Sequence, residues 1–348
     1  MIRVLVIGAG TMGRAHASAY AVMPGVKLVG IADIQADKAS VLAAKWSTRA
    51  FPSFEEAVQE LGLAGIDVID ICLPTPLHKE LVVKSADAGK HVICEKPIAR
   101  SAEDAAFMIR YCREKGVRLF VGHVLRFFPE YVKAKALLDQ GSIGKPAVIR
   151  AGRGGGYPIG WNDWYGDFDA SGGVTLDAMI HDFDYLRWCF GEVERVYAKG
   201  LHGRHQAQLD YALVTLRFRS GVIAHVEGTW AHEGFSMYFE MAGTTGVIDY
   251  DSRKDTPIVY KSRRQSETVP GVIVPESPLA QSPYYRELAH FMSCIQDGSE
   301  PLVMAEDALE ALRISLAALS SMSSGQPVLL APDAGTLVEA HSYRGVIS

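Results

Sequence analysis

The first third of the chain alternates short apolar runs with amphipathic stretches. The apolar runs are rich in β-branched residues and apolar on both faces, which is typical of buried parallel strands. They cover residues 2–7, 26–32, 68–73, 91–94 and 118–121. Helical patterns fill the intervals at 12–23, 36–45, 53–61, 78–88 and 101–115. This alternation predicts an α/β domain over residues 1–121, built on a doubly wound parallel sheet as in the Rossmann fold.

The pattern changes after residue 121. A helix is predicted over 129–139, and strands then follow one another at 147–153, 193–199, 209–217, 222–230, 237–242 and 246–250. Helices are predicted at 173–189, 283–295 and 305–321. Arg219-Ser220-Gly221 and Gly243-Thr244-Thr245-Gly246 have the composition of hairpin turns. Residues 122–348 are therefore expected to form an α+β domain with a large, open, mainly antiparallel sheet.

Composition narrows the class of protein. A length of 348 residues suits two domains, and 48% hydrophobic residues suffice for packed cores. The net charge of −5 comes without a basic stripe, so nucleic acid is not an expected partner. No apolar run approaches the ~18 residues of a membrane span. The five cysteines lack a C-x-x-C pair, which argues against disulfides and structural zinc and favours the reducing cytoplasm.

A glycine-rich turn follows the first strand. In Gly8-Ala9-Gly10-Thr11-Met12-Gly13, the first glycine permits a tight turn, the second lets backbone approach a pyrophosphate, and the third lets helix pack on strand. The phosphate would lie at the helix N-terminus, against Thr11 and Met12. Asp33 follows about 20 residues later, where a carboxylate binds the ribose 2′-hydroxyl. The next residue, Ile34, offers no cation for a 2′-phosphate, so NAD is favoured over NADP. The alternative is a related domain that binds a flavin or a nucleotide sugar.

A lysine ends the strand predicted at 91–94. His91-Val92-Ile93-Cys94-Glu95-Lys96-Pro97 closes a buried run with two charges and a proline. Ligands of open α/β sheets bind outside the carboxyl ends of the strands, so Lys96 is expected to face the cofactor crevice. The alternative is a solvated strand end with an exposed lysine.

An acid and a histidine are spaced four apart in the helix predicted at 173–189. Asp177 and His181 would then share one helical face. Imidazole titrates near neutrality and suits a general base, and a carboxylate nearby could orient it or raise its pKa. Hydride transfer from an alcohol needs such a base, with Lys96 stabilising the developing alkoxide. Alternatively the pair is a surface or capping interaction, or Asp177, His181 and Asp184 bind zinc or manganese; our expectation is that no metal is bound.

Aromatic residues crowd the stretch before this helix. Their faces, interleaved with hydrogen-bonding groups, suit a polyol or sugar ring, although they could instead pack beneath a loop. The set comprises Tyr157, Trp161, Asn162, Asp163, Trp164 and Tyr165.

The order and spacing of these motifs resemble the Gfo/Idh/MocA dehydrogenases, the family of glucose–fructose oxidoreductase and inositol dehydrogenase, over nearly the whole chain. The resemblance is carried by Gly8–Gly13, Pro74-Thr75-Pro76-Leu77-His78, Gly89-Lys90-His91, Glu95-Lys96-Pro97, Arg126-Phe127 and Gly172-Gly173 with Asp177 and His181. It implies that Lys96, Asp177 and His181 form the catalytic set. It also implies that Glu95 and Pro97 shape the cofactor pocket, which Leu73, Pro74, Thr75 and His78 line.

The resemblance also bears on substrate and assembly. It implies a sugar, inositol or sugar-derivative substrate, contacted by Arg153, Tyr157, Trp161 and Trp164 beside the catalytic set, and a homodimer or homotetramer formed through the C-terminal sheet. Arg126 would lie near the domain junction, where it binds cofactor or substrate or pairs with an acid structurally. Many relatives carry asparagine at the place of Val124, so His123 is the candidate polar contact here. Two other functions remain open: a reductase of a non-sugar carbonyl or unsaturated compound, and a non-catalytic NAD-binding regulator.

Overall fold

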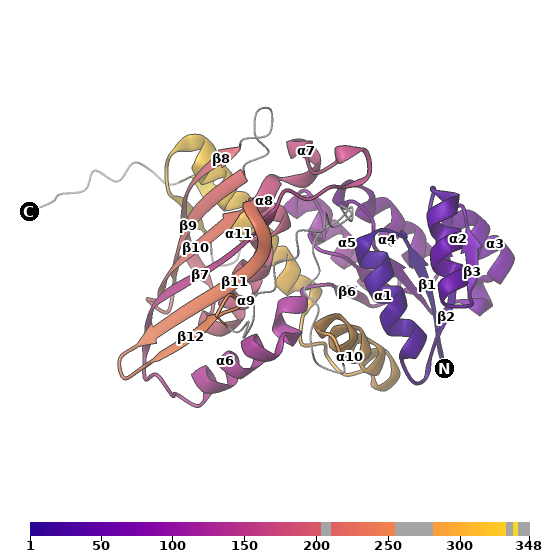
Figure 1. The fold of residues 1–348 in the computed structure, drawn as a ribbon, viewed down its shortest axis with the longest axis horizontal. Helices are drawn as coiled ribbons and strands as arrows, with labels where there is room; N and C mark the ends of the chain where they lie inside the picture. Colours follow the sequence, from indigo (N-terminus) through magenta and orange to yellow (C-terminus); the bar gives the residue numbers. More distant parts are fainter. Residues whose placement is uncertain (203–209, 255–280, 332–336, 340–348) are drawn as a thin grey trace, which may run out of the picture. The chain divides into compact units, whose positions relative to one another are not determined.

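The computed structural model describes residues 1–202, 210–254, 281–331 and 337–339. The chain divides into two compact units, each discontinuous in sequence (Figure 1). The first combines Met1–Pro129 with Pro270–Leu309, and the second combines Glu130–Val269 with Glu310–Ser348. Within the described residues, no helix has the length and apolarity needed to cross a lipid bilayer.

The first unit contains a six-stranded parallel sheet in the order β3-β2-β1-β4-β5-β6. Its strands are β1 (Ile2–Ile7), β2 (Val26–Ala32), β3 (Arg49–Phe51), β4 (Val68–Ile71), β5 (His91–Cys94) and β6 (Leu119–Val121). This is the strand order of the Rossmann fold, in which the direction of winding reverses between β1 and β4. The predicted fold class of the first domain is therefore confirmed, and ligands of such sheets bind at that reversal.

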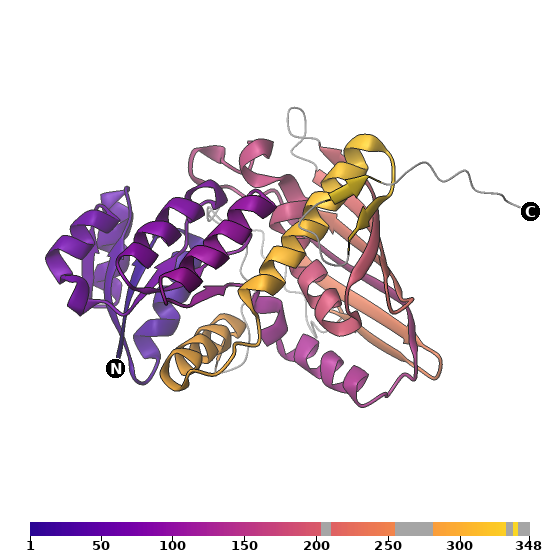
Figure 2. The same cartoon turned by 180° about the vertical axis from the view of Figure 1, so that it is seen from behind.

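Helices cover both faces of this sheet. They are α1 (Thr11–Val22), α2 (Ala36–Lys45), α3 (Phe54–Leu61), α4 (His78–Asp87) and α5 (Ala102–Glu114), with short 3₁₀ turns η1 (Leu63–Gly65), η2 (Thr75–Leu77) and η3 (Val124–Phe127). The pair α4 and α5 packs together on one face (Figure 1 and Figure 2). Ser101 caps α5 by accepting a hydrogen bond from the Asp104 amide at 3.1 Å.

A helix from far along the chain completes the core of the first unit. Helix α10 (Pro283–Asp297) packs beside α1, and its Leu288, Phe291 and Met292 join the apolar cluster formed by β1 and α1 (Figure 1). The Phe291 ring lies 4.9 Å from the Phe120 ring of β6. The sequence-based division at residue 121 assigned this helix to the second domain, and the structure corrects it. Hydrophobic spacing identifies an amphipathic helix without specifying which sheet its apolar face covers.

The second unit contains an eight-stranded sheet in the order β12-β11-β7-β10-β9-β8-β13-β14. Its strands are β7 (Pro146–Gly156), β8 (Val193–His202), β9 (Asp210–Phe218), β10 (Ile223–Thr229), β11 (Ala231–Gly243), β12 (Val247–Asp251), β13 (Val328–Leu330) and β14 (Leu337–Glu339). Every pairing is antiparallel except that of β7 with β10. The predicted antiparallel α+β half is confirmed, as are both hairpin turns. Residue 209, the predicted first residue of β9, lies outside the described residues.

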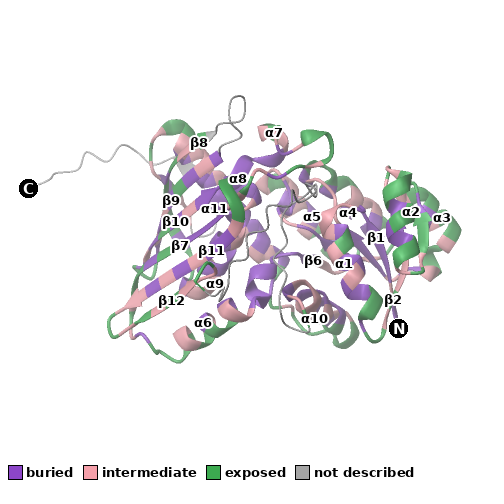
Figure 3. Cartoon of the chain, in the orientation of Figure 1, coloured by how far each residue is buried: buried purple, intermediate pink, exposed green. Residues whose placement is uncertain are grey.

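Alternate residues of this sheet are buried, as Figure 3 shows along its strands. In β9, Ala212, Val214, Leu216 and Phe218 are buried, while Leu213 is exposed. The helices of the unit are α6 (Pro129–Asp139), α7 (Phe168–Ser171), α8 (Gly173–Asp177), α9 (Ile180–Phe190) and most of α11 (Ala305–Ser324), with the turn η4 (Trp161–Asp163). One face of the sheet therefore packs against a core, and the other presents side chains outward.

The single helix predicted over 173–189 is wrong, because the structure has two. The amide of Met179 bonds to Val174 O, five residues back, and the amide of His181 bonds to Ala178 O, three residues back. The regular helical ladder is thus interrupted between α8 and α9. The break seats Met179 against β10, where a Cβ added to Gly228 would lie 2.4 Å from Met179 Cγ.

Candidate active site

In the glycine-rich loop between β1 and α1, Gly8 and Gly13 are closely packed, whereas Gly10 borders open space. Gly8 has φ +104°, and an added Cβ would lie 2.3 Å from Cys72 O. A Cβ on Gly13 would lie 1.7 Å from Gly8 O, so α1 packs directly on the turn. A Cβ on Gly10 would meet nothing within 4 Å. The loop therefore needs glycine at 8 and 13 for packing, and Gly10 leaves room for a ligand to approach the backbone.

Asp33 lies at the end of β2, next to this loop. Its Oδ2 accepts a hydrogen bond from the Ala9 amide at 2.7 Å, and its Oδ1 accepts one from the Gln35 amide at 2.7 Å. The carboxylate is thereby fixed beside the turn, while the neighbouring Ile34 is 71% exposed. Thr11 and Met12 are the first residues of α1, whose N-cap residue Gly10 has no side chain to satisfy the free amides. These groups fit a dinucleotide, with phosphate at the helix N-terminus and a ribose at Asp33.

A histidine, His78, fixes the segment that follows β4 through contacts with two backbone carbonyls. The ring of His78 is buried, with Nδ1 2.9 Å from Pro97 O and Nε2 2.8 Å from Leu73 O. Burial lowers the pKa of His78 despite these carbonyl partners. His78 was expected to line the cofactor path, but both of its ring nitrogens contact backbone. It ties the Leu73-Pro74-Thr75 segment to the loop that carries Lys96.

Lys96 follows the carboxyl end of β5 in a partly buried position. Its backbone amide donates a hydrogen bond to Glu95 Oε2 at 3.1 Å. Glu95 is only 5% exposed, and its Oε1 lies 3.1 Å from His16 Nε2. The following peptide bond, Lys96–Pro97, is cis. A Cβ on Gly122 would lie 3.3 Å from Glu95 Oε1, so the carboxylate packs against backbone.

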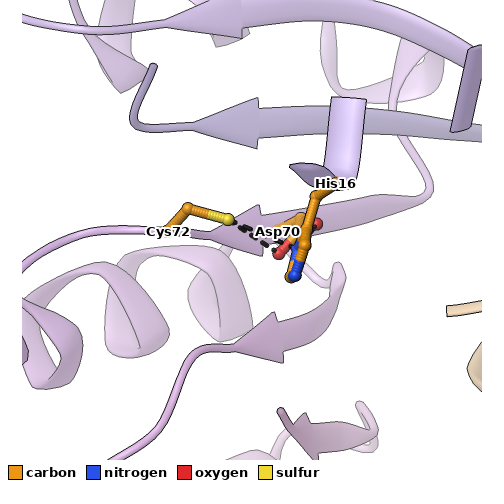
Figure 4. A group of neighbouring side chains, drawn as sticks. All are labelled: His16, Asp70 and Cys72. Carbon is orange, nitrogen blue, oxygen red and sulfur yellow. Dashed lines mark hydrogen bonds and ion pairs between the residues drawn. The ribbon is translucent and has the colours of Figure 1, made fainter. Parts of the chain in front are cut away.

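Sequence reasoning missed a buried polar cluster beneath this loop. His16, Asp70 and Cys72 point toward one another (Figure 4), with His16 Nδ1 2.8 Å from Asp70 Oδ2 and 3.4 Å from Cys72 Sγ. Their potential ligand atoms all lie within 4.8 Å of one another. The sequence does contain a signal, because Asp70 stands in an otherwise apolar strand, and buried acids need partners.

The groups of this cluster bond to one another. Burial raises the pKa of the Cys72 thiol well above its ordinary value, so in the absence of a metal ion the thiol is protonated. His16 Nδ1 is already hydrogen-bonded to Asp70. The metal set considered from sequence, Asp177, His181 and Asp184, does not gather its ligand atoms in this way in the described part of the chain.

In the second unit, Asp177 and His181 lie on separate helices. Asp177 ends α8 and is 5% exposed, while His181 lies in the first turn of α9. The four-residue spacing therefore does not place them on one continuous helical face, which corrects the geometric argument made from sequence.

Arg153, on β7, was expected to contact substrate. Its Nε and Nη2 instead donate to Asp182 of α9 at 2.5 and 2.9 Å. Both side chains are almost completely buried, at 7% and 2% exposure. This bidentate ion pair fastens α9 to the sheet.

The two basic residues after β6 are buried within the first unit. His123 is fully buried. Arg126 is 2% exposed and donates from Nη1 to Leu302 O at 2.8 Å and to Asp307 Oδ2 at 3.1 Å. Of the roles considered for Arg126, the structural pairing with an acid is the one observed.

The aromatic stretch contains both buried, packed rings and an exposed ring. Tyr165 is buried, packs at a tilt against Trp164 with 4.1 Å between ring centroids, and forms a T-shaped pair with Trp230 at 6.0 Å. Tyr157 also packs against Trp230, at 5.5 Å. Trp161, by contrast, is 45% exposed. Two non-glycine residues between these rings, Asn162 and Asp163, adopt positive φ of 49° and 48°. Such conformations cluster at binding sites.

Comparison with known proteins agrees with this geometry. Residues 2–123 match the family described as "Oxidoreductase family, NAD-binding Rossmann fold", and residues 131–249 match the "GFO/IDH/MocA C-terminal domain". The chain is 31% identical to scyllo-inositol 2-dehydrogenase (NAD(+)) of Bacillus subtilis, covering 94% of this chain and 96% of that protein. It is 30% identical to myo-inositol 2-dehydrogenase of Thermotoga maritima, covering 94% and 98%.

A solved structure of a related protein has a similar fold. Scyllo-inositol dehydrogenase from Lactobacillus casei, with bound NAD(H) and scyllo-inositol, superposes with a TM-score of 0.78 at 25% identity, covering 94% of this chain and 99% of that one. The predictions of an oxidoreductase and of an NAD-binding Rossmann domain are confirmed. This protein belongs to the GFO/IDH/MocA family of oxidoreductases.

Proposed function

We propose that this oxidoreductase is an NAD-dependent dehydrogenase that interconverts a secondary hydroxyl and a ketone on a sugar, an inositol or a sugar derivative. One observation carries the proposal. The glycine-rich loop follows β1 and Lys96 follows β5, so both lie at the carboxyl edge of one parallel sheet, where ligands of this fold bind. The inositol dehydrogenases among the relatives favour the substrate class.

The cofactor would be held by backbone and by one carboxylate. The amides of Gly10, Thr11, Met12 and Gly13 would meet the pyrophosphate, and Asp33 would accept from the ribose hydroxyls. A 2′-phosphate would encounter Asp33 with no compensating cation at Ile34, so NAD is preferred over NADP. Leu73, Pro74, Thr75, Glu95 and Pro97 would line the path toward the nicotinamide. When bound, NAD supplies the hydride acceptor or donor.

In the proposed mechanism, Lys96 stabilises the developing negative charge, and His181 with Asp177 handles the proton. The Lys96 ammonium stabilises the alkoxide that develops as the hydroxyl loses its proton. His181 accepts that proton, and Asp177 orients the imidazole and stabilises its charged form. Oxidation removes one hydride and one proton from the alcohol and leaves the ketone. Tyr157, Trp161 and Trp164 would supply aromatic faces for the ring of the substrate.

The test is a screen of polyols and sugars with NAD, followed by absorbance at about 340 nm. We expect turnover of at least one inositol or sugar. Lys96→Ala should abolish turnover while leaving NAD binding intact in calorimetry. The matched control is Lys115→Ala, which removes a 41% exposed lysine paired with Asp87 at the end of α5. Undiminished turnover by Lys96→Ala would refute the mechanism, and turnover of only non-sugar carbonyl compounds would refute the substrate class.

We also propose that the C-terminal sheet mediates homodimer or homotetramer formation. Its outward face carries the exposed apolar side chains of Val148, Tyr197 and Leu213, which are 42%, 38% and 42% exposed. The strand registers place them on one face together with Thr215 and His225. Light scattering after size exclusion should give a dimer or tetramer, and a monomer at micromolar concentration would refute the assembly. The five free cysteines favour the reducing cytoplasm as the compartment.

A further inference from the structure

His16 lies between two buried carboxylates that neighbouring strands supply. It belongs to α1, one helical turn beyond the glycine-rich loop, and is fully buried. Its Nδ1 lies 2.8 Å from Asp70 Oδ2 on β4, and its Nε2 lies 3.1 Å from Glu95 Oε1 just after β5. Figure 4 shows His16 and Asp70 facing each other beside Cys72. The imidazole therefore links the centre of the sheet to the residue that precedes Lys96.

Further donors extend this link at both ends. The Tyr20 hydroxyl donates to Asp70 Oδ2 at 2.8 Å, and the Cys72 thiol lies 3.6 Å from Asp70 Oδ1. At the other end, Glu95 Oε2 accepts from the Lys96 amide at 3.1 Å. Hydrogen bonds thus join Tyr20, Asp70 and His16, the close contact of His16 with Glu95 continues the chain, and a hydrogen bond joins Glu95 to the backbone of Lys96. Every member belongs to the first unit.

Two carboxylates within 3.1 Å of its ring favour a charged His16. A neutral imidazole has one N–H, so one ring nitrogen would direct its lone pair at a carboxylate oxygen. An imidazolium donates to Asp70 and is attracted by the Glu95 carboxylate 3.1 Å from its other ring nitrogen. Burial opposes that charge, but the attraction of Asp70, with a smaller contribution from Cys72 and hydrogen bonds to both, raises the pKa of His16 well above its ordinary value. The neighbouring titratable groups on α10 are Tyr284, whose ring lies 6.5 Å from the imidazole, and Glu287, whose charge contributes to raising the pKa of Tyr20.

The charge of Glu95 follows from that of His16. Burial raises the pKa of this carboxyl, but the close contact and charge of His16, followed by the charge of Lys96, lower it overall. Without a cation at position 16, burial would favour the protonated acid. A protonated Glu95 is a weaker acceptor for the Lys96 amide than the carboxylate, because charge-assisted hydrogen bonds are about twice as strong.

We propose that His16 is a positioning residue for Lys96: as an imidazolium, it keeps Glu95 ionised and holds the carboxylate that fixes the Lys96 backbone. The inference rests on the proposed function, which gives Lys96 its role. Catalytic geometry is sensitive to such support, since a displacement of about 1 Å can cost about a hundredfold in rate. Packing of Glu95 against Gly122 leaves the carboxylate little alternative space.

The first experiment measures the charge of His16 in the intact wild-type protein. Histidine labelled with ¹⁵N would be followed by NMR between about pH 6 and pH 8.5, with His16→Gln assigning the signal. We expect both His16 ring nitrogens to keep imidazolium shifts throughout, while exposed histidines titrate near pH 6.5. A neutral His16 tautomer at pH 7.5 would overturn the proposal. Stoichiometric zinc in the purified protein would also overturn it, because a zinc-bound His16 is not an imidazolium.

The second experiment measures turnover. Glutamine at position 16 can donate to Glu95 but carries no charge, so His16→Gln should lower kcat by about 10- to 100-fold, the usual cost of losing such support. Calorimetric NAD affinity should change less than about threefold. The ratio of wild-type kcat to variant kcat should grow as pH falls from 8 to 6, since Glu95 becomes protonated only in the variant, whereas protonation of the base His181 affects both proteins alike.

The matched control is His91→Gln. His91 lies at the amino end of β5, where its Nδ1 accepts from the Arg118 amide at 3.1 Å. We expect this variant to lose stability without changing kcat. If His16→Gln and His91→Gln have the same kcat at every pH, His16 has no positioning role. If His16→Gln does not fold, Asp70→Asn applies the same test, because it removes the charge that keeps His16 protonated while Tyr20 retains an acceptor.

The two proposals fail in different ways. Full turnover by Lys96→Ala refutes the proposed function, and the role of His16 in positioning Lys96 falls with it. An inactive Lys96→Ala together with a fully active His16→Gln refutes the positioning role alone. The NMR measurement needs no substrate, so a neutral His16 refutes the positioning role even if no sugar is turned over.

Discussion

The ion pair between Arg153 and Asp182 provides a direct test of whether Arg153 is structural. Replacing Arg153 by methionine leaves Asp182 as an uncompensated charge that is 2% exposed. Loss of one partner of a buried pair costs about 3–5 kcal/mol, because the remaining charge stays desolvated. At roughly 2–4 °C per kcal/mol for a unit of this size, the Tm should fall by about 6–20 °C.

A control and a second variant make the measurement specific. Arg150, on the same strand, pairs with Glu240 at 2.9 Å, but the two side chains are 64% and 41% exposed. Arg150→Met should therefore cost less than about 1 kcal/mol. The double variant Arg153→Met/Asp182→Leu should recover most of the lost stability, because replacing both charges by apolar side chains removes the desolvation cost. Calorimetry or circular dichroism would report the Tm values.

The outcome distinguishes the two assignments of Arg153. If Arg153→Met is as stable as Arg150→Met while its KM for substrate rises, then Arg153 binds substrate as the sequence suggested. A large loss of stability that Asp182→Leu reverses would instead assign Arg153 to the structure of the second unit.

Four further outcomes are expected. Gly13→Ala should abolish NAD binding in calorimetry, because the added Cβ would lie 1.7 Å from Gly8 O; wild-type affinity would contradict the packing argument. Asp33→Ser should relax the preference for NAD over NADP, and an unchanged ratio of kcat/KM values would remove Asp33 from cofactor recognition. Dialysis against EDTA should leave turnover unchanged, whereas loss of activity restored by zinc or manganese would reinstate a metal. The hydrogen bond from Arg3 lowers the pKa of Asp67, so its stabilisation is present above the ordinary carboxyl pKa and is lost as pH falls through the lowered value. The difference in Tm between wild type and Asp67→Asn should accordingly shrink between pH 5 and about pH 2, and a constant difference would exclude this linkage.

The hydrophobic pattern predicted the bounds of a strand well where the strand is one mostly apolar run. The strands β1, β2 and β5 have the predicted bounds, because continuous β-branched runs are typical of a parallel sheet covered on both faces. The edge strand β3 (Arg49–Phe51) was not predicted. It has three residues, two of them exposed, and its position depends on pairing with β2 rather than on an apolar pattern of its own.

Tertiary contacts explain the other differences between the predictions from sequence and the structure. At the break between α8 and α9, Met179 packs on Gly228, a residue far away in the sequence. The spacing of Asp177 and His181 could not reveal it. Similarly, the sequence suggested that Arg153 and Arg126 bind substrate or cofactor. Their partners Asp182 and Asp307 lie on helices that only the tertiary structure brings next to the arginines. The glycine loop and Asp33 were predictable because their geometry is local to one βαβ unit.

Helix α10 has a consequence for how the protein is made. The apolar cluster of β1 and α1 is completed by Leu288, Phe291 and Met292. A ribosome synthesises these residues after nearly all of the second sheet. The first unit therefore cannot bury its core while it alone has emerged, and its final closure follows synthesis of most of the chain. A fragment ending at residue 121 would leave the Phe120 ring and the α1 surface without their cover. Such a fragment would bind chaperones or aggregate, although it contains every residue of the glycine-rich loop.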